Sequence, residues 1–221
     1  MTEQEYIEKV KVKLDEFSPF DKPSSFIAAN GEDSMKVKPI VAYIENELRN
    51  AVHYCLSFLP QSILSKDITK SETSFSLNGR VGVVASTENI DWYAKRLIRV
   101  QVPNYWKRDV TAFMKSEDVG YLLQQNEHTR GGDNKPVVVY VAEKNELELY
   151  SFPKKLEGEG EETDWTVNVW YIDTLKTADA VASNIEDFII IKCAQLVADI
   201  LGNTNAATAL DKEYQRKVAA L

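Results

Sequence analysis

Residues 183–221 read SNIEDFIIIKCAQLVADILGNTNAATALDKEYQRKVAAL and predict a pair of helices at the end of the chain. Ser183 followed three positions later by Glu186 is the pattern of a capping box, in which two side chains satisfy backbone amides at a helix start. Apolar positions then recur every three or four residues, so that one broad stripe of the helix faces a core. The residues on this stripe are Ile185, Phe188, Ile189, Lys192, Leu196 and Ile200.

A Gly-Asn break separates the two predicted helices. Gly202 stands where helices commonly end in a left-handed residue, because glycine adopts that conformation without a steric penalty. We expect Asn205 or Thr204 to cap the following helix with its side-chain oxygen. The apolar face of that helix comprises Ala206, Leu210, Tyr214 and Val218.

Helical patterns also open the chain. Thr2 and Glu5 form a second capping box, and the helix that they start is expected to end before Pro19. A longer helix is predicted from Pro39 to Pro60, because proline is tolerated in the first turn of a helix and stops it later. The stretch between Pro19 and Pro39 is rich in polar residues and is expected to form a loop.

The middle of the chain changes to the period of β-strands. Asn78-Gly79 lies between short apolar runs and predicts a hairpin with a type I′ turn, in which both central residues have positive φ. Further strands are predicted over residues 94–102, 137–141, 147–152 and 165–172. Helical spacing predicts short helices over residues 105–114 and 116–125, and the acidic residues 157–164 predict a solvated loop.

These elements predict an α+β fold. We expect a helical bundle built from the N- and C-terminal helices, with an inserted antiparallel β-rich subdomain. The expected boundaries are residues 1–70 for the first helical part, 71–176 for the β-rich insertion and 177–221 for the second helical part, which packs on the first.

Composition argues against two classes of function. Asp and Glu outnumber Lys and Arg by 34 to 26, which gives a net charge of −8, whereas a protein that grips nucleic acid through its phosphates is expected to be basic. No run approaches the roughly 20 apolar residues that a membrane-spanning helix needs. Cys55 and Cys193 both fall within predicted helices, and we expect them to be core thiols rather than a disulfide.

Catalytic and metal-binding patterns are weak. His53 lies in a predicted helix and His128 in a predicted loop, with no second histidine at metal-ligand spacing. A base, a nucleophile and an orienting group cannot all be assigned, so we expect no enzyme activity, no cofactor and no metal.

Two readings remain for the exposed polar residues. Aromatic and cationic residues alternate around residue 106, as in single-strand binders, and a nucleic-acid-binding packaging factor would use Lys95, Arg96, Arg99, Lys107 and Arg108. Alternatively, the same region and the loop at residues 128–133 contact other proteins. The expected protein-contact residues are Trp106, Arg108, Arg130, Tyr214 and Arg216.

The chain resembles the head-to-tail connector, or adaptor, proteins of tailed bacteriophages, and more narrowly the ring-forming tail accessory factors of podovirus-like and crAss-like phages. The segments that carry the resemblance are YWKRDV at 105–110, YLLQQN at 121–126 with TRGG at 129–132, KPVVV at 135–139, and IKCA to ILG at 191–202. The likeness covers roughly residues 35–221, and its motifs are structural rather than catalytic.

The resemblance implies a virion protein at the head-tail junction, made in the cytoplasm of the bacterial host. It implies a homo-oligomeric ring of roughly twelve copies, bound to the portal protein on one side and to an adjacent tail ring or nozzle protein on the other. Double-stranded DNA would pass through the ring without sequence-specific binding, which suits an acidic protein because negative charge repels phosphates. Connector subunits of this kind usually have a simple helical core, so the β-rich insertion departs from the family pattern.

Overall fold

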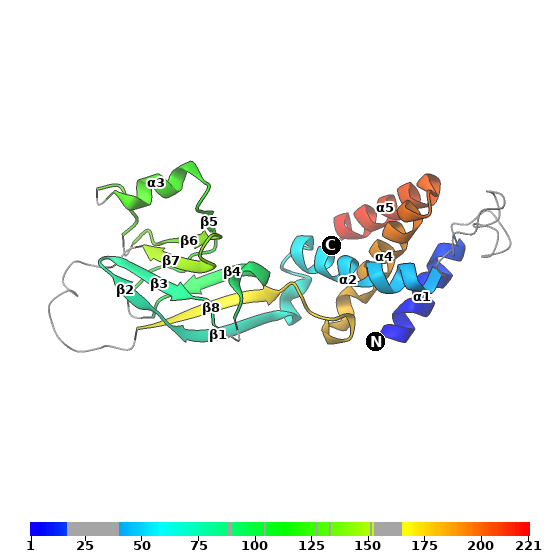
Figure 1. The fold of residues 1–221 in the computed structure, drawn as a ribbon, viewed down its shortest axis with the longest axis horizontal. Helices are drawn as coiled ribbons and strands as arrows, with labels where there is room; N and C mark the ends of the chain where they lie inside the picture. The colour runs from blue at the N-terminus through cyan, green and yellow to red at the C-terminus, as the bar shows by residue number, and fades with distance from the viewer. Residues whose placement is uncertain are drawn as a thin grey trace. The chain divides into compact units, whose positions relative to one another are not determined.

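The computed structural model describes residues 1–16, 40–87, 90–103, 105–126, 128–132, 134–150, 152 and 165–221. The fold is mixed α+β, as the sequence predicts. The chain divides into two compact units, of which unit 1 comprises Met1–Asp67 and Thr174–Leu221 and unit 2 comprises Ile68–Asp173 (Figure 1). The predicted loops between Pro19 and Pro39 and at 157–164 lie outside the described residues.

Unit 1 is helical. Its α-helices are α1 (Glu3–Glu16), α2 (Ile40–Phe58), α4 (Glu186–Ile200) and α5 (Thr204–Ala219), and α1, α2 and α5 each pack against α4. Short 3-10 turns lie at Leu64–Lys66, Ala178–Ala180 and Ser183–Ile185. Helix α4 buries nine of its residues, and this nearly continuous burial fits a helix that is covered by neighbours on several sides.

The helix ends test the capping predictions. Thr2 and Glu5 form the expected capping box, because the Thr2 amide donates to Glu5 Oε2 at 2.7 Å and the Glu5 amide donates to Thr2 Oγ1 at 3.3 Å. Gly202 has φ +74° and ends α4 as expected, with the amides of Gly202 and Asn203 donating to the carbonyls of Asp199 and Ala198.

Two capping predictions are wrong. Ser183 begins a 3-10 turn instead of capping α4, whose N-cap is Ile185 with no side-chain hydrogen bond, and Glu186 accepts instead from the amino group of Met1 at 3.0 Å. The cap of α5 is Asn203, whose side chain accepts from the Ala206 amide at 3.1 Å, because the tight turn at Gly202 starts the next helix earlier than expected.

Unit 2 contains two β-sheets. The first has strand order β1 (Ile68–Ser74), β8 (Thr166–Asp173), β4 (Lys95–Gln101), and both pairings are antiparallel. The second has the order β2 (Ser76–Asn78), β3 (Val81–Ala85), β7 (Glu146–Tyr150), β6 (Val137–Val141), β5 (Met114–Lys115). Here the prediction of an antiparallel insertion is wrong in one place, since β5 pairs with β6 in parallel.

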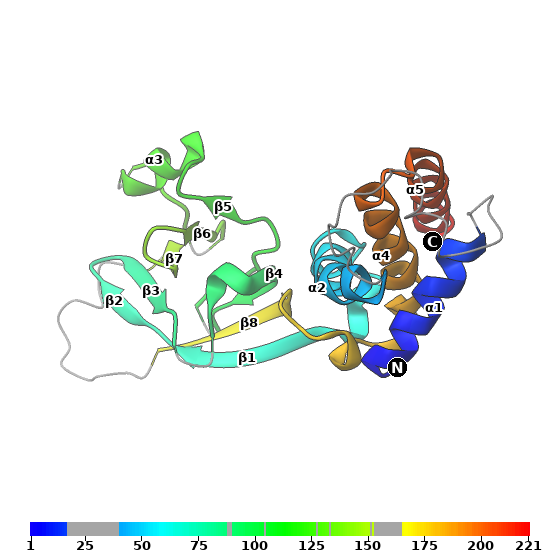
Figure 2. The same cartoon turned by 45° about the vertical axis from the view of Figure 1, so that its right-hand side comes forward.

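The core of unit 2 contains side chains from both sheets and a cluster of aromatic rings. Phe152 lies at its centre, with ring centroids 5.2 Å from Phe75, 5.9 Å from Tyr105 and 6.3 Å from Trp165. Helix α3 (Val119–Gln125) lies at the periphery of the unit, next to β5, and a 3-10 turn at Trp92–Ala94 precedes β4 (Figures 1 and 2).

Two further predictions for unit 2 are wrong. Asn78 pairs with Val81, so the hairpin loop is Gly79-Arg80, and only Gly79 has positive φ, as in a type II′ turn. Residues 105–114 form no helix among the described positions. Trp106 and Val110 are buried there because the segment folds over the sheet and Val110 pairs with Val100, and this arrangement repeats the spacing of a helix by chance.

Candidate assembly surface

The candidate surface for contacts with other proteins is built around α3. We define the α3 arm as β5, α3 and the loop that follows it, residues 114–126 and 128–132. At the start of the arm, the Lys115 amide donates to Asp118 Oδ2 at 2.7 Å and the Tyr121 amide donates to the Asp118 carbonyl at 2.9 Å. Gly120 lets the helix lie close to β5, since a Cβ there would lie 3.2 Å from Met114 Sδ.

The loop after α3 holds the end of the helix. Thr129 Oγ1 donates to the Leu123 carbonyl at 2.6 Å, and Arg130 Nη2 donates to the Gln125 carbonyl at 3.2 Å. The Gly131 amide donates to Gln124 Oε1 at 2.9 Å. Because the last carbonyls of a helix have no partner within the helix, these contacts make the short α3 a supported element.

The polarity of α3 is inverted. Gln124 is buried, with 6% of its surface exposed, whereas Val119, Leu122 and Leu123 are 84%, 68% and 53% exposed. A surface helix normally buries its apolar side, so folding of the subunit alone does not account for this pattern. Three apolar side chains held outward on a supported helix are typical of a surface that contacts another protein.

Arg130, a predicted contact residue, lies in this arm. Its guanidinium reaches back to the helix end, and its Nε is buried without a hydrogen-bond partner among the described residues. Arg130 therefore supports the arm from within. Sequence reasoning missed the exposed apolar residues of α3, since spacing alone does not say which face of a helix is covered.

The other predicted contact residues lie elsewhere in the two units. In unit 2, Trp106 is 7% exposed and Arg108 is exposed. In unit 1, Tyr214 is 4% exposed and packs edge-on against Phe188 with ring centroids 5.9 Å apart, while Arg216 is exposed. Trp106 and Tyr214 therefore contribute to the cores, and the side chains of Arg108 and Arg216 reach solvent.

Two residues of the nucleic-acid alternative, Lys95 and Arg99, form ion pairs within unit 2. Lys95 Nζ lies 2.8 Å from Asp173 Oδ2, and Arg99 Nη1 lies 3.3 Å from Asp109 Oδ2. Arg99 also stacks on the ring of Trp170, 3.7 Å from its centroid. Ion pairs of this kind reduce the charge that remains for phosphates.

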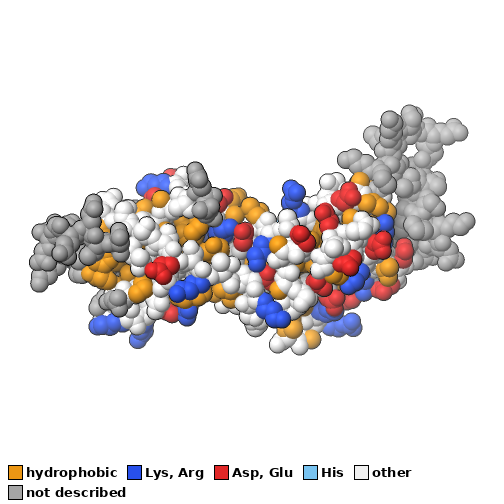
Figure 3. All heavy atoms as spheres, turned by 90° about the horizontal axis from the view of Figure 1, so that it is seen from below, with side chains coloured by type: hydrophobic (Ala, Val, Ile, Leu, Met, Phe, Trp, Pro, Cys, Tyr) orange, Lys and Arg blue, Asp and Glu red, His pale blue; other side chains and the backbone are white. Residues whose placement is uncertain are grey.

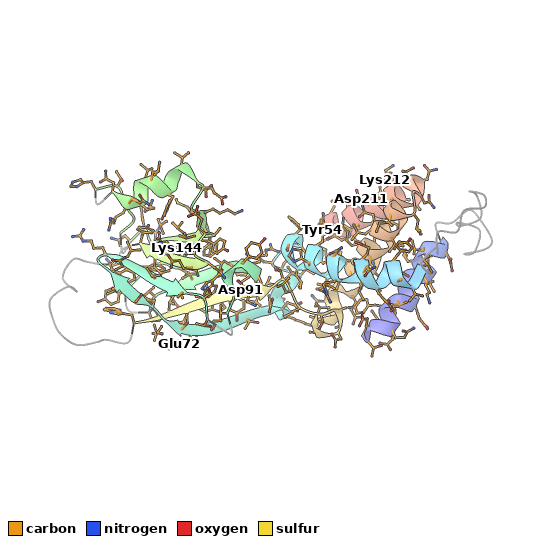
Figure 4. All side chains as sticks on the ribbon, viewed as in Figure 1. Tyr54, Glu72, Asp91, Lys144, Asp211 and Lys212 are labelled. Carbon is orange, nitrogen blue, oxygen red and sulfur yellow. The ribbon has the colours of Figure 1, made fainter. Side chains whose placement is uncertain are left out.

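One buried cation lies in the core of unit 1. Lys192, placed on the apolar stripe of its helix by the sequence, is 7% exposed, and its Nζ lies 3.8 Å from the Tyr54 ring centroid and 2.8 Å from Gln195 Oε1. Figure 4 labels Tyr54, which extends from α2. Burial lowers the pKa of Lys192, although Asp211 and other nearby groups partly oppose this shift.

The remaining candidates for chemistry are structural in their surroundings. His53 Nδ1 lies 3.1 Å from the Thr174 carbonyl, and Cys55 and Cys193 are buried and unpaired with each other, as expected. Burial raises the pKa of each thiol to about 12, which keeps it protonated and unreactive. No group of three or more potential metal ligands occurs among the described residues.

A cleft of about 620 Å³ lies in unit 1, between the start of α1, the middle of α2 and residues 175–179. Its lining mixes Glu3, Glu45 and Asp179 with Arg49 and Lys176, which gives no single charge to attract a ligand. In the part of the chain that the structure describes, none of the helices is long and apolar enough to span a membrane.

No protein-family model matches the sequence, and no curated protein is similar to it at a significant level.

Proposed function

We propose that the protein is a structural virion subunit that forms an oligomeric ring between the portal and the tail of a phage and surrounds the DNA channel. The observation that carries an assembly function is the α3 arm, in which three exposed apolar side chains lie on a helix supported by its own loop. The resemblance to head-to-tail connector proteins supplies the kind of assembly.

The proposed architecture is a connector-like helical bundle with a β-rich insertion. Helices from both ends of the sequence pack around α4, which supports such a bundle in unit 1. In this proposal the bundles lie side by side around the ring, and the α3 arm of unit 2 contacts a neighbouring subunit or tail protein through repeated heterologous contacts. The net charge of −8 suits a channel through which DNA slides.

The direct test uses the protein with the portal of the same virus. We expect the purified protein to close into rings on portal particles, seen by electron microscopy, and to appear in mass spectra of intact virions. A protein that neither binds its portal nor occurs in virions would contradict the proposal.

The contribution of the α3 arm is tested by Leu122→Glu. A charge on the exposed apolar face should prevent ring formation on the portal. The free energy of unfolding of the monomer should stay within about 0.5 kcal/mol of the wild-type value, because Leu122 is 68% exposed. Gln125→Glu is the matched control, since Gln125 is exposed on the same helix and receives the same charge. Equal ring formation by Leu122→Glu and Gln125→Glu would exclude the apolar face as the contact.

A further inference from the structure

The outer face of the three-stranded sheet in unit 2 carries an ordered pattern of charge. Along β8, Val167, Val169 and Tyr171 face the core, so Asn168 and Trp170 lie on the opposite face. The strand register places Lys70 of β1 and Arg99 of β4 on either side of Trp170.

The same register places Glu72 and Gln101 on either side of Asn168. We call the six residues of these two rows the Trp170 face: Lys70, Trp170 and Arg99 in the first row, and Glu72, Asn168 and Gln101 in the second.

The first row is cationic around an aromatic ring. Lys70 Nζ lies 5.3 Å and the Arg99 guanidinium 3.7 Å from the ring centroid of Trp170. The three residues form one row across the strands, and the Arg99 guanidinium stacks on the ring. Trp and Arg are among the residue types that most often dominate protein–protein contacts.

The second row is acidic at its ends. Glu72 is exposed on β1, and Figure 4 shows its label at the lower edge of unit 2. Val110 pairs with Val100, which places Asp109 beside Gln101 at the other end of the row. Figure 3, seen from below, shows acidic and basic side chains next to one another on unit 2.

Asn168, between these acids, is 8% exposed, and its Oδ1 is buried without a hydrogen-bond partner among the described residues. This oxygen has almost no accessible surface, so a second molecule does not reach it, and Asn168 is the uncharged centre of the second row.

We propose that two copies of the protein pair face to face through the Trp170 face, about a two-fold axis that runs across the strands between the two rows. This axis exchanges the rows, so that Lys70 of one copy lies against Glu72 of the other. Trp170 of one copy then lies over Asn168 of the other, and the contact is isologous. The pairing goes beyond the proposed ring, because it needs no portal and uses a symmetry that ring contacts do not.

A second copy fits this face better than a nucleic acid does. A polyanion would meet the acidic row as closely as the cationic one, and Arg99 already has a carboxylate 3.3 Å away. A copy turned by the two-fold axis instead brings opposite charges together along β1. The complementary pair is Lys70 with Glu72, since Arg99 already has Asp109 of its own subunit as a partner.

The test is a charge exchange in the 221-residue protein, measured by sedimentation velocity over a dilution series. Lys70→Glu should weaken self-association by about tenfold or more, because the introduced carboxylate would then face Glu72 of the other copy. Glu72→Lys should do the same by bringing two lysines together. The double variant K70E/E72K should restore association, because each acid again meets a lysine.

An equimolar mixture of the two single variants gives the sharpest result. One copy then carries two acids and the other two lysines, so we expect a heterodimer at least as tight as the wild-type dimer. Both positions are exposed strand residues, and far-ultraviolet circular dichroism checks that each variant is folded. Glu8→Lys and Lys9→Glu, exposed residues of α1, are the matched controls and should leave association unchanged.

Several outcomes would overturn the pairing: a wild-type protein that is monomeric at all concentrations, a double variant no better than the singles, or a mixture that does not associate. Binding of a DNA duplex that is lost in Lys70→Glu, without self-association, would assign the face to nucleic acid instead. None of these outcomes bears on the ring, which is tested separately with portal particles and the α3 arm.

Discussion

Gly82 in β3 is a position where a single atom decides the packing of the aromatic core. A Cβ at Gly82 would lie 2.8 Å from Phe75 Cδ2 and 2.9 Å from Phe152 Cε2, closer than real side-chain carbons approach. Both phenylalanines are buried in the cluster, so neither ring can move aside without disturbing its neighbours.

We therefore expect Gly82→Ala to destabilise the protein by about 1–3 kcal/mol. Urea unfolding followed by tryptophan fluorescence measures this loss, since Trp106 and Trp165 belong to or pack against the same cluster. Gly132→Ala is the control, because nothing lies within 4 Å of a Cβ there. Equal stabilities of the two variants would contradict the close packing at Gly82.

Lys192 is a single buried charge that affects the free energy of unfolding. The folded state lowers the pKa of this ammonium below 10.5, so the folded state binds fewer protons than the unfolded state between the two pKa values. Burial of the charge therefore costs stability at neutral pH, and this cost disappears as the pH rises toward 10.5.

Lys192→Met should consequently stabilise the protein by about 1 kcal/mol at pH 7, because methionine fills a similar volume without a charge. The advantage should shrink as the pH approaches 10.5. Thermal unfolding of both proteins at pH 7 and pH 10 provides the comparison. A lower stability of the variant at pH 7 would show that the Tyr54 ring and Gln195 outweigh the loss of water around the ammonium.

At the scale of elements, α4 is the helix on which unit 1 depends. Ile189 in its middle is fully buried, whereas Ile200 at its end is 51% exposed. Ile189→Asp should destabilise the protein by about 4 kcal/mol or more, since an unpaired carboxylate would lie in an apolar core. Ile200→Asp should cost less than about 1 kcal/mol. Chemical denaturation of the two variants decides whether burial on α4 sets the difference.

The elements also show what local sequence can and cannot predict. Capping residues act through neighbours in sequence, and so Thr2 with Glu5 and Gly202 follow the expected pattern. The spacing around Trp106 predicts a helix where the structure has none, because the same spacing arises when an irregular chain places aromatic rings into a core. Period alone cannot separate these two cases.

The two candidate surfaces cannot be predicted from local sequence for a different reason. The exposed side of α3 depends on Gln124 being covered by the loop at Gly131, and the row of Lys70, Trp170 and Arg99 depends on strands distant in the chain. Both surfaces depend on tertiary contacts, which local sequence patterns do not specify. The sequence predicts Arg130 as a contact residue but does not place the exposed apolar residues of α3 beside it in the chain.

At the scale of the whole molecule, the boundaries of the units permit a direct experiment. The chain leaves unit 1 after Asp67 and returns at Thr174, and Ile68 pairs with Ile172 near both crossings. A protein in which residues 69–172 are replaced by a short Gly-Ser linker should fold, because α1, α2, α4 and α5 keep their mutual contacts. Helical circular dichroism and a cooperative thermal transition would show this, and an unfolded product would mean that unit 1 needs its insertion.

The pairing of Ile68 with Ile172 has an evolutionary consequence as well. An inserted unit whose first and last residues lie next to each other can be gained, lost or exchanged without moving the two chain ends of the helical unit that it joins. Related chains could therefore keep the helices and carry quite different modules at this position, each suited to a different neighbour.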